Sequence, residues 1–292
     1  MTRAPAEARA ARAGLCALPV LSVLAVSAAL VSASCSATLM KRMTLPPGPG
    51  ASAVPVPAAD EALKQATAAC RGMQTITAEV GVAGSVGGHR APHGHLIVAL
   101  ASPASARIEA IAPFGPVFIF VALHADSTLL LVRDNRILEH GSPADVLEAL
   151  TGVPLDAAEL RTMVTGCAVS ADAAEARQPA DGWMTMPDGT GTIYLRRSRR
   201  GDPWQIATAV RYDSSGAEWH AEYRDFQNGL ARSIHLWASD PGRFDLGLSL
   251  SQVEINVPLD ANVFGMRIPP AAVPMTLNEL RDNGPVESSN GR

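Results

Sequence analysis

Three histidines, His89, His93 and His95, lie close together in the sequence and carry the side chains best suited to binding a metal ion. Three imidazole nitrogens can hold Zn²⁺ and leave a fourth position open. No carboxylate stands nearby in the sequence to orient the imidazoles, as metal-binding histidines usually require. The alternative is a polar turn beside Gly87 and Gly88, and this is the interpretation we favour. We therefore expect no metal site.

Motifs for covalent or phosphate chemistry are absent from the sequence. It contains no Gly-x-Ser-x-Gly nucleophile elbow, no His-Glu-x-x-His zinc motif and no glycine-rich phosphate loop. An enzyme stays a weaker hypothesis, which metal held by the three histidines would revive. We expect a protein that is not an enzyme and that uses no cofactor.

Cys35 follows a segment typical of an export signal. A basic leader, Met1–Gly14, precedes an apolar stretch, Leu15–Val31. The small residues just before Cys35 resemble the lipobox of bacterial lipoproteins. We expect residues 1–34 to be a lipoprotein signal peptide and Cys35 to be the site of lipid attachment, and Ser36 favours the outer membrane, facing the periplasm. The alternatives are ordinary cleavage to a soluble protein and an uncleaved membrane anchor.

Composition divides the remaining chain into three parts. Residues 35–59 are rich in proline and predict an extended tether. Residues 60–280 suit one larger domain, and the polar residues 281–292 predict a disordered tail. The formal net charge of −4 lacks the positive charge that is typical of proteins that bind nucleic acid. One basic cluster, Arg196–Arg200, is expected to be a solvated hairpin tip, and the alternative is a contact with anionic lipid headgroups.

Cys70 and Cys167 are the two cysteines left inside the expected domain. An exported protein lies in an oxidising compartment, so we expect these two cysteines to form a disulfide. The bond would tie the first helix of the domain to the end of a helical segment. The alternative is a pair of buried free thiols.

Three helices are predicted from their end signals. The first covers residues 61–70. Ser142 and Asp156 are expected to cap two further helices, each with an acidic residue three positions on. Gly152 and Gly166 are expected to end them. The last two helices would form a lid.

Strands are predicted wherever apolar and polar residues alternate between turn signals. The predicted ranges are 75–86, 95–102, 107–112, 117–123, 128–133, 136–140, 204–212, 218–226, 230–237, 244–257 (with a bulge at Gln252) and 263–268. The strand over 117–123 does not alternate, which predicts burial on both faces. Antiparallel strands with one apolar face must cover that face, so we expect an α+β fold with a strongly curved, barrel-like sheet plugged by helices. An apolar cavity is plausible inside such a sheet.

Several segments in a fixed order carry a family resemblance. They are the strand Arg107–Ala112, the loop Pro113-Phe114-Gly115, the hairpin through Asp134, Leu150–Leu155 leading into Leu160–Gly166, and the final Val263–Pro269. In this order they resemble the LolA/LolB family of bacterial lipoprotein carriers and receptors, most closely the outer-membrane receptor LolB. The resemblance implies a half-open barrel of about eleven strands, with a helical lid over a cavity for the acyl chains of lipoproteins.

The resemblance also implies a loop that dips into a membrane, formed by Pro113, Phe114 and Gly115. Phe114 stands where the receptor has a protruding leucine, and the alternative is a buried turn aromatic. Six side chains are candidates for the cavity wall: Phe118, Phe120, Trp219, Tyr223, Leu236 and Leu248. Each of them could equally belong to the plain core.

The expected function is therefore that of a lipid-anchored periplasmic protein that binds acyl chains and aids their localisation to the outer membrane. The expected partners are acylated lipoproteins or lipids, a periplasmic lipoprotein carrier and, through the lipid anchor, the outer membrane; no nucleic acid is expected. The alternative is a structural or assembly lipoprotein of the same fold, which binds a protein partner and carries no lipid.

Overall fold

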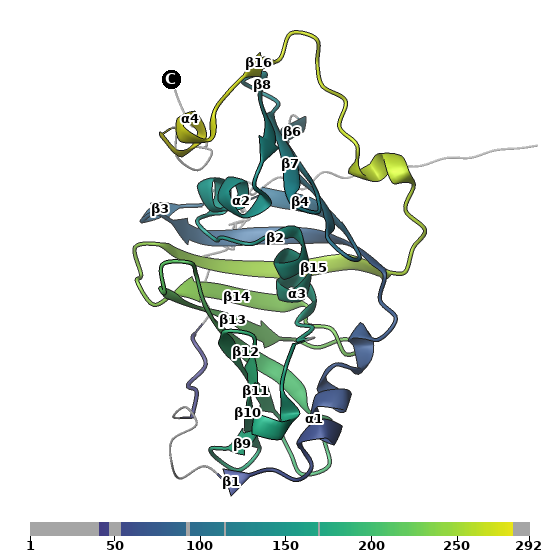
Figure 1. Cartoon of the computed structure of the whole chain (residues 1–292), viewed down its shortest axis with the longest axis vertical. Helices are drawn as coiled ribbons and strands as arrows, with labels where there is room; N and C mark the ends of the chain where they lie inside the picture. The colour runs from purple at the N-terminus through teal and green to yellow at the C-terminus, as the bar shows by residue number, and fades with distance from the viewer. Residues whose placement is uncertain (1–40, 47–53, 92–93, 114, 169, 283–292) are drawn as a thin grey trace, which may run out of the picture. The chain divides into compact units, whose positions relative to one another are not determined.

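The computed structural model of the chain describes residues 41–46, 54–91, 94–113, 115–168 and 170–282. These residues form one sheet of sixteen strands, antiparallel except at one edge, together with a few short helices (Figure 1). No helix among them is both long and apolar enough to cross a membrane.

The sheet is built in two halves. The first half runs from the middle outwards through β2 (Thr75–Val86), β4 (Gly94–Ala101), β5 (Ser105–Ala112), β6 (Gly115–Leu123), β7 (Asp126–Leu131) and β8 (Arg136–Gly141). The second half returns from the far side through β9 (Arg177–Gln178), β10 (Trp183–Asp188), β11 (Gly191–Arg196), β12 (Gln205–Tyr212), β13 (Glu218–Arg224), β14 (Ser233–Ala238) and β15 (Phe244–Ile255). The long strands β15 and β2 then pair, which joins the two halves.

Three further strands of two residues each complete the sheet. β1 (Val54–Pro55) pairs with β9 at one edge, β16 (Val273–Pro274) runs parallel to β8 at the other, and β3 (His89–Arg90) pairs with β2. The expected curved antiparallel sheet is confirmed, but the half-open barrel of about eleven strands is wrong: fifteen strands follow one another in the sheet, and the sheet is open. The missed strands lie in short or weakly alternating stretches, which include the whole β10–β11 hairpin.

The topology places two helices across one face of the sheet. Strands β8 and β9 lie towards opposite edges, so the connection between them has to run over a face. That connection contains α2 (Pro143–Thr151), which contacts β7, and α3 (Ala157–Thr165), which contacts β4 and β5 (Figure 1). We call these two helices the lid, and we call the face beneath them the inner face.

The lid helices begin and end at the residues that the sequence predicts. Asp156 and Glu159 form a capping box, in which each side chain accepts a hydrogen bond from the other residue's backbone N–H, at 2.8 and 2.9 Å. Gly152 and Gly166 end the two helices in the left-handed conformation, with φ of 74° and 68°. Ser142 stands at the N-cap of α2 but its side chain makes no capping hydrogen bond.

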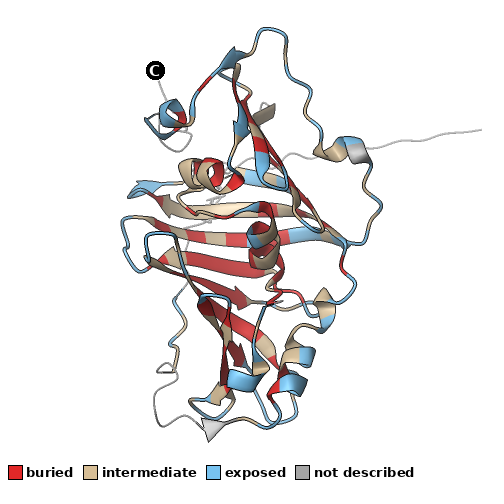
Figure 2. Cartoon of the chain, in the orientation of Figure 1, coloured by how far each residue is buried: buried red, intermediate tan, exposed pale blue. Residues whose placement is uncertain are grey.

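Alternation along the central strands makes the inner face apolar. On β15, Phe244, Leu246, Leu248 and Leu250 are all buried on this face, whereas Ser249 on the opposite face is exposed. Figure 2 shows buried segments in red along the central strands and on the helices that cross them. The lid adds Leu147, Leu150, Leu160, Met163 and Val164 to the same core. Burying one such side chain stabilises the fold by about 1.5–3 kcal/mol, so covering the inner face is a large part of what holds the domain together.

Other expected elements differ from the structure. The first helix, α1, covers Ala59–Ala66 and is followed by a 3-10 turn, Ala68–Cys70. Strand β6 is buried on both faces only towards its end, over Phe120, Val121 and Ala122. The slip of alternation at Gln252 is confirmed, because the pairing with β2 shifts register there.

The strand expected over 263–268 is wrong. A 3-10 helix, Ala261–Phe264, stands there, and an irregular segment follows it. The guanidinium of Arg107 donates hydrogen bonds to the carbonyls of Val263 and Gly265, at 3.0 and 2.8 Å. Those carbonyls are satisfied by a side chain, so the segment does not need a neighbouring strand.

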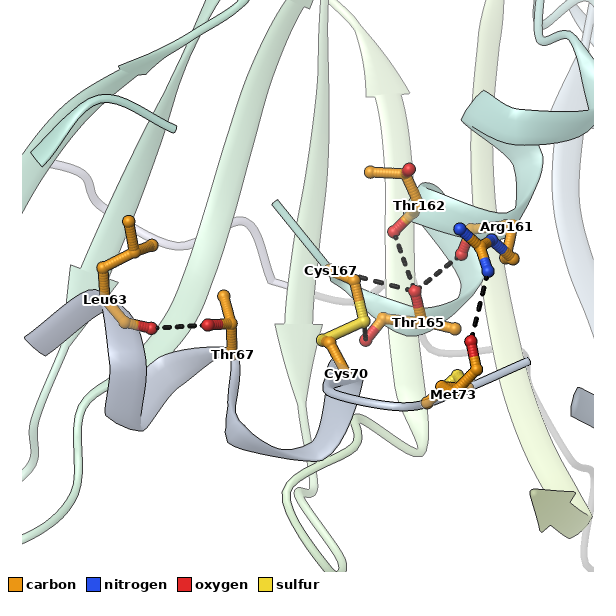
Figure 3. The surroundings of a disulfide bond; sticks show 8 residues. All are labelled: Leu63, Thr67, Cys70, Met73, Arg161, Thr162, Thr165 and Cys167. Atoms are coloured by element: carbon orange, nitrogen blue, oxygen red, sulfur yellow. Dashed lines mark hydrogen bonds between the residues drawn. A yellow bond between two sulfur atoms is a disulfide. The ribbon is translucent and has the colours of Figure 1, made fainter. Parts of the chain in front are cut away.

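A disulfide between Cys70 and Cys167 ties the end of the lid to the segment after α1 (Figure 3). Arg161 on α3 also donates a hydrogen bond to the carbonyl of Met73, at 3.4 Å. The Thr165 hydroxyl donates to the Arg161 carbonyl at 2.7 Å and accepts from the Cys167 N–H at 3.3 Å. The C-terminal end of α3 is therefore fixed both covalently and by hydrogen bonds.

Replacing both cysteines by serine (Cys70→Ser with Cys167→Ser) is expected to lower the free energy of unfolding by about 2–4 kcal/mol, because the bond closes a long loop in the unfolded chain. Urea unfolding followed by circular dichroism measures the change. Reducing agent should produce the same loss in the unaltered protein and no further loss in the double variant. Equal stability of the two proteins would contradict a stabilising role for the bond.

Candidate functional site

A cavity of about 200 Å³ lies between the lid helix α3 and the inner face of β12 and β13. Two of the predicted wall residues, Trp219 and Tyr223, form part of its lining. Both come from β13, where they are two positions either side of Ala221 and so point to the same face. All three are buried.

Small side chains create the space in the floor of the cavity. Ala209 on β12 pairs directly with Ala221 on β13, and both line the cavity. Two facing alanines leave a gap between the larger rings of Trp219 and Tyr223. The Trp219 ring is itself held by an edge-on contact with Phe244, with ring centroids 6.5 Å apart.

The lid supplies the opposite wall. Glu159, Thr162 and Met163 line the cavity from α3, and residues three and four positions apart share one face of a helix. Gly166, at the end of the helix, lies against the ring of Tyr223, so that a Cβ placed there would come 3.3 Å from the ring. Floor and lid therefore touch closely at the end nearest the disulfide.

One side of the cavity is polar. Asp188 at the end of β10 and Arg211 on β12 both line it and form an ion pair. The Asp188 side chain is buried, and the pairing offsets the cost of burying its charge. Burial raises the pKa of the Tyr223 phenol, so this side chain stays protonated and neutral at physiological pH. The site thus offers an apolar floor and a rim able to hydrogen-bond.

The other four predicted wall residues do not line the cavity. Phe120, Leu236 and Leu248 are buried in the core beneath the helices. Phe118 is partly buried and packs against that core. Trp219 and Tyr223 belong to the same core, and alternation identifies the face of a strand but not how its neighbours cover it.

The remaining predicted sites are described only in part. In the expected membrane loop, Pro113 is exposed and Gly115 has a positive φ of 113°, whereas Phe114 lies outside the described residues. The lipid attachment site, Cys35, also lies outside them. His89 and His95 are exposed and His93 is not described; no metal-binding group of three or more His, Cys, Asp or Glu occurs among the residues that are.

The outer face of β13–β15 carries a buried polar network that was not predicted as a site. Glu222 lies at its centre and is 1% exposed. Its carboxylate accepts hydrogen bonds from Trp237 Nε1 at 3.1 Å, from Arg224 Nη2 at 2.7 Å and from the backbone N–H of Met43 at 2.9 and 3.0 Å. Alternation along β13 puts its polar residues on one face, but it does not show which segment covers them.

Residues 41–46 provide that cover, although the sequence assigns them to the tether. The Arg42 guanidinium lies over the Trp237 ring, 4.2 Å from its centroid, and pairs with Asp245 at 3.0 Å. Arg224 donates a hydrogen bond to the carbonyl of Lys41. The segment is therefore bound to the outer face by charge, by stacking and by backbone hydrogen bonds.

Two carboxylates of this network have lowered pKa values. Burial alone would raise the pKa of Asp245, but hydrogen bonds from His235 and Arg42 outweigh burial and lower it. Burial likewise opposes the charged form of Glu218, and hydrogen bonds from His220 and Ser239 lower its pKa. Burial lowers the pKa of His220, whose ring stacks on Trp237 with centroids 3.7 Å apart.

Comparison with solved structures shows a LolA-like fold. A LolA superfamily protein from Nitrosomonas europaea is similar with a TM-score of 0.51 and 10% identity, over 71% of this chain and 97% of that chain. A domain from Vibrio parahaemolyticus named for outer membrane lipoprotein sorting gives a TM-score of 0.45 and 12% identity, over 71% and 97%. The sequence itself matches no protein family model and no curated protein. The likeness therefore concerns the fold.

Acid is expected to weaken the outer-face network. A carboxylate whose pKa is lowered by folding contributes stability above its unfolded pKa of about 4, and this contribution is lost as the pH falls through the lower, folded value. The free energy of unfolding, measured with urea between neutral and acidic pH, should fall with pH less steeply in Asp245→Asn than in the unaltered protein.

The matched control is Asp134→Asn, which removes an exposed carboxylate from the turn between β7 and β8. Its pH dependence should follow that of the unaltered protein. If the free energy of unfolding of Asp245→Asn has the same pH dependence as that of the unaltered protein, the network does not contribute to stability in the way that its hydrogen bonds indicate.

Proposed function

We propose that this chain binds acyl chains of lipoproteins or lipids on the inner face of its sheet, beneath the lid, and aids their localisation to the outer membrane. The observation that carries the proposal is the cavity between α3 and β13, with its apolar floor of Trp219, Ala221 and Tyr223. The LolA-like fold supports it. An acyl chain transferred through water needs such an apolar host, because exposing its methylene groups is costly.

The cavity as it stands is small. Its volume of about 200 Å³ is below the range of roughly 300–1,000 Å³ usual for ligand pockets. Binding a whole acyl chain therefore requires α3 to move away from the sheet. The contacts that it would give up are apolar ones, made by Leu160, Met163 and Val164, and the guest would replace them with contacts of the same kind.

The two ends of α3 are held differently. The disulfide at Cys167 and the hydrogen bond from Arg161 hold the C-terminal end of α3. Its N-terminal end is joined to α2 by a short connection that begins at Gly152. We propose that α3 pivots about the disulfide, so that the mouth opens at the N-terminal end of the helix, and that the Asp188–Arg211 rim meets the polar part of the guest.

The finer assignment is that of a receptor resembling LolB. In this proposal Cys35 is lipidated and holds the protein to the outer membrane facing the periplasm, a periplasmic carrier delivers the acylated cargo, and Phe114 dips into the membrane. It is supported by the leader sequence ahead of Cys35 and by the exposure of Pro113 beside the loop. The proposal involves no enzymatic step and no cofactor.

A second candidate is a structural or assembly lipoprotein that carries no lipid. The observation that favours it is the same small volume of the cavity, because the protein's own helices already fill most of the inner face. In that case the function would lie in binding a protein partner. Direct measurement of acyl binding separates the two candidates.

Ala221→Leu is expected to abolish binding of a triacylated lipopeptide, because the larger side chain enters the gap between Trp219 and Tyr223. Overpacking should lower the free energy of unfolding by about 1–3 kcal/mol and leave the fold intact. Native mass spectrometry of the full chain, with the lipopeptide and with its delipidated form, measures binding.

Ala83→Leu makes the same change on the outer face of β2 and is the control. It should bind the lipopeptide in the same way as the unaltered protein, and no protein should bind the delipidated peptide. Binding that survives Ala221→Leu would place the acyl chain elsewhere. A folded protein that binds no lipopeptide at all would favour the structural candidate.

A further inference from the structure

Four arginines lie at the end of β11 and in the connection that follows it towards β12. Arg196, Arg197, Arg199 and Arg200 stand within five residues, and we call them the basic tip. Three of them are exposed, and Arg197 is half-buried. They line an open hollow of about 470 Å³ together with Asp181 and Trp183.

The charges of the basic tip are not neutralised by ion pairs. Within the part of the chain that the structure describes, none of the four guanidinium groups forms an ion pair with a carboxylate. Half of the other described arginines do so: Arg42, Arg107, Arg136, Arg211, Arg224, Arg243 and Arg281. Asp181 in the lining and the nearby Asp202 offset only part of the charge, so the tip presents a positive potential to solvent.

Two tryptophans anchor the base of the basic tip. Arg196 lies over the ring of Trp183, 5.3 Å from its centroid, and Arg197 lies over the ring of Trp204 at 4.7 Å. Trp183 is only partly buried and also lines the hollow. Tryptophan beside arginine is a combination suited to the boundary between water and lipid, where an amphipathic ring and a cation both find partners.

The basic tip is separate from the cavity under the lid. Trp183 begins β10, whereas Asp188, which lines the cavity, ends the same strand. Five residue steps along a strand span about 17 Å, so the basic tip and the cavity lie at opposite ends of the β10–β11 hairpin. The arginines therefore do not serve a guest in the cavity.

We propose that the basic tip binds the anionic headgroup surface of a phospholipid bilayer. The hollow that the four arginines line is open, and three of the four are exposed to solvent, which suits a surface of many phosphates better than a single enclosed anion. The planar, positively charged guanidinium group of arginine can donate two parallel hydrogen bonds to the oxygens of a phosphate. This inference stands independently of the proposed function, because it requires neither an acyl guest nor lipidation of Cys35.

The test compares two double variants of the full chain that remove the same charge. Arg199→Gln with Arg200→Gln alters the basic tip at exposed residues that make no stacking contact. Arg71→Gln with Arg90→Gln removes two exposed arginines elsewhere. Association is measured by co-sedimentation with vesicles of phosphatidylcholine alone and with mixed vesicles of phosphatidylcholine and phosphatidylglycerol.

The unaltered protein should partition more strongly onto the mixed vesicles, and added salt should weaken that preference. The tip variant should lose about 30-fold in partitioning onto mixed vesicles, since each arginine near an anionic surface contributes about 1 kcal/mol, and the control variant should lose little. The vesicles of phosphatidylcholine alone measure any contribution from the apolar leader, which all variants share.

Three outcomes would overturn the proposal. The first is equal loss in both double variants, which would mean that only net charge matters. The second is equal partitioning onto both kinds of vesicle. The third is displacement by inorganic phosphate at constant ionic strength, which would assign the hollow to a soluble anion.

Discussion

The apolar inner face of the sheet is the constraint on which the rest of the structure depends. Strands β12 to β15 direct buried aliphatic and aromatic side chains to that face, and water has to be kept from them. The described residues form no second sheet that could pack against it. The connection between the two halves of the sheet has to cross the same face, so its helices α2 and α3 provide the cover.

A cover made of short helices has consequences that a second sheet would not have. A helix satisfies its own backbone hydrogen bonds, so α3 can leave the sheet without exposing unpaired backbone groups to an apolar guest. Its capping box keeps the helix formed at the end that would move, and the disulfide fixes the other end. The facing alanines, Ala209 and Ala221, place the remaining gap beneath this helix.

Local signals predicted much of this arrangement, and contacts between distant residues account for what they missed. Caps and glycines located both lid helices, and Cys70 and Cys167 were the pair left to form a bond. The strand expected at 263–268 is absent because Arg107, far away in the sequence, donates hydrogen bonds to two backbone carbonyls of that segment. Likewise, alternation put Leu236 and Leu248 on the inner face, but only the path of the lid decides which inner residues border a cavity. The sequence assigns residues 41–46 to the tether because their partners, Glu222 and Trp237, lie about 180 and 195 residues away.

The central claim is that an acyl chain lies between α3 and β13. The most direct measurement uses a triacylated lipopeptide with a photoactivatable diazirine in one acyl chain, followed by mass-spectrometric mapping of the cross-linked peptides. The account predicts adducts on residues 155–166 and 218–224, lost when the same lipopeptide without the diazirine is added in excess. Adducts confined to the outer face, or scattered over the surface and not reduced by that competitor, would contradict it.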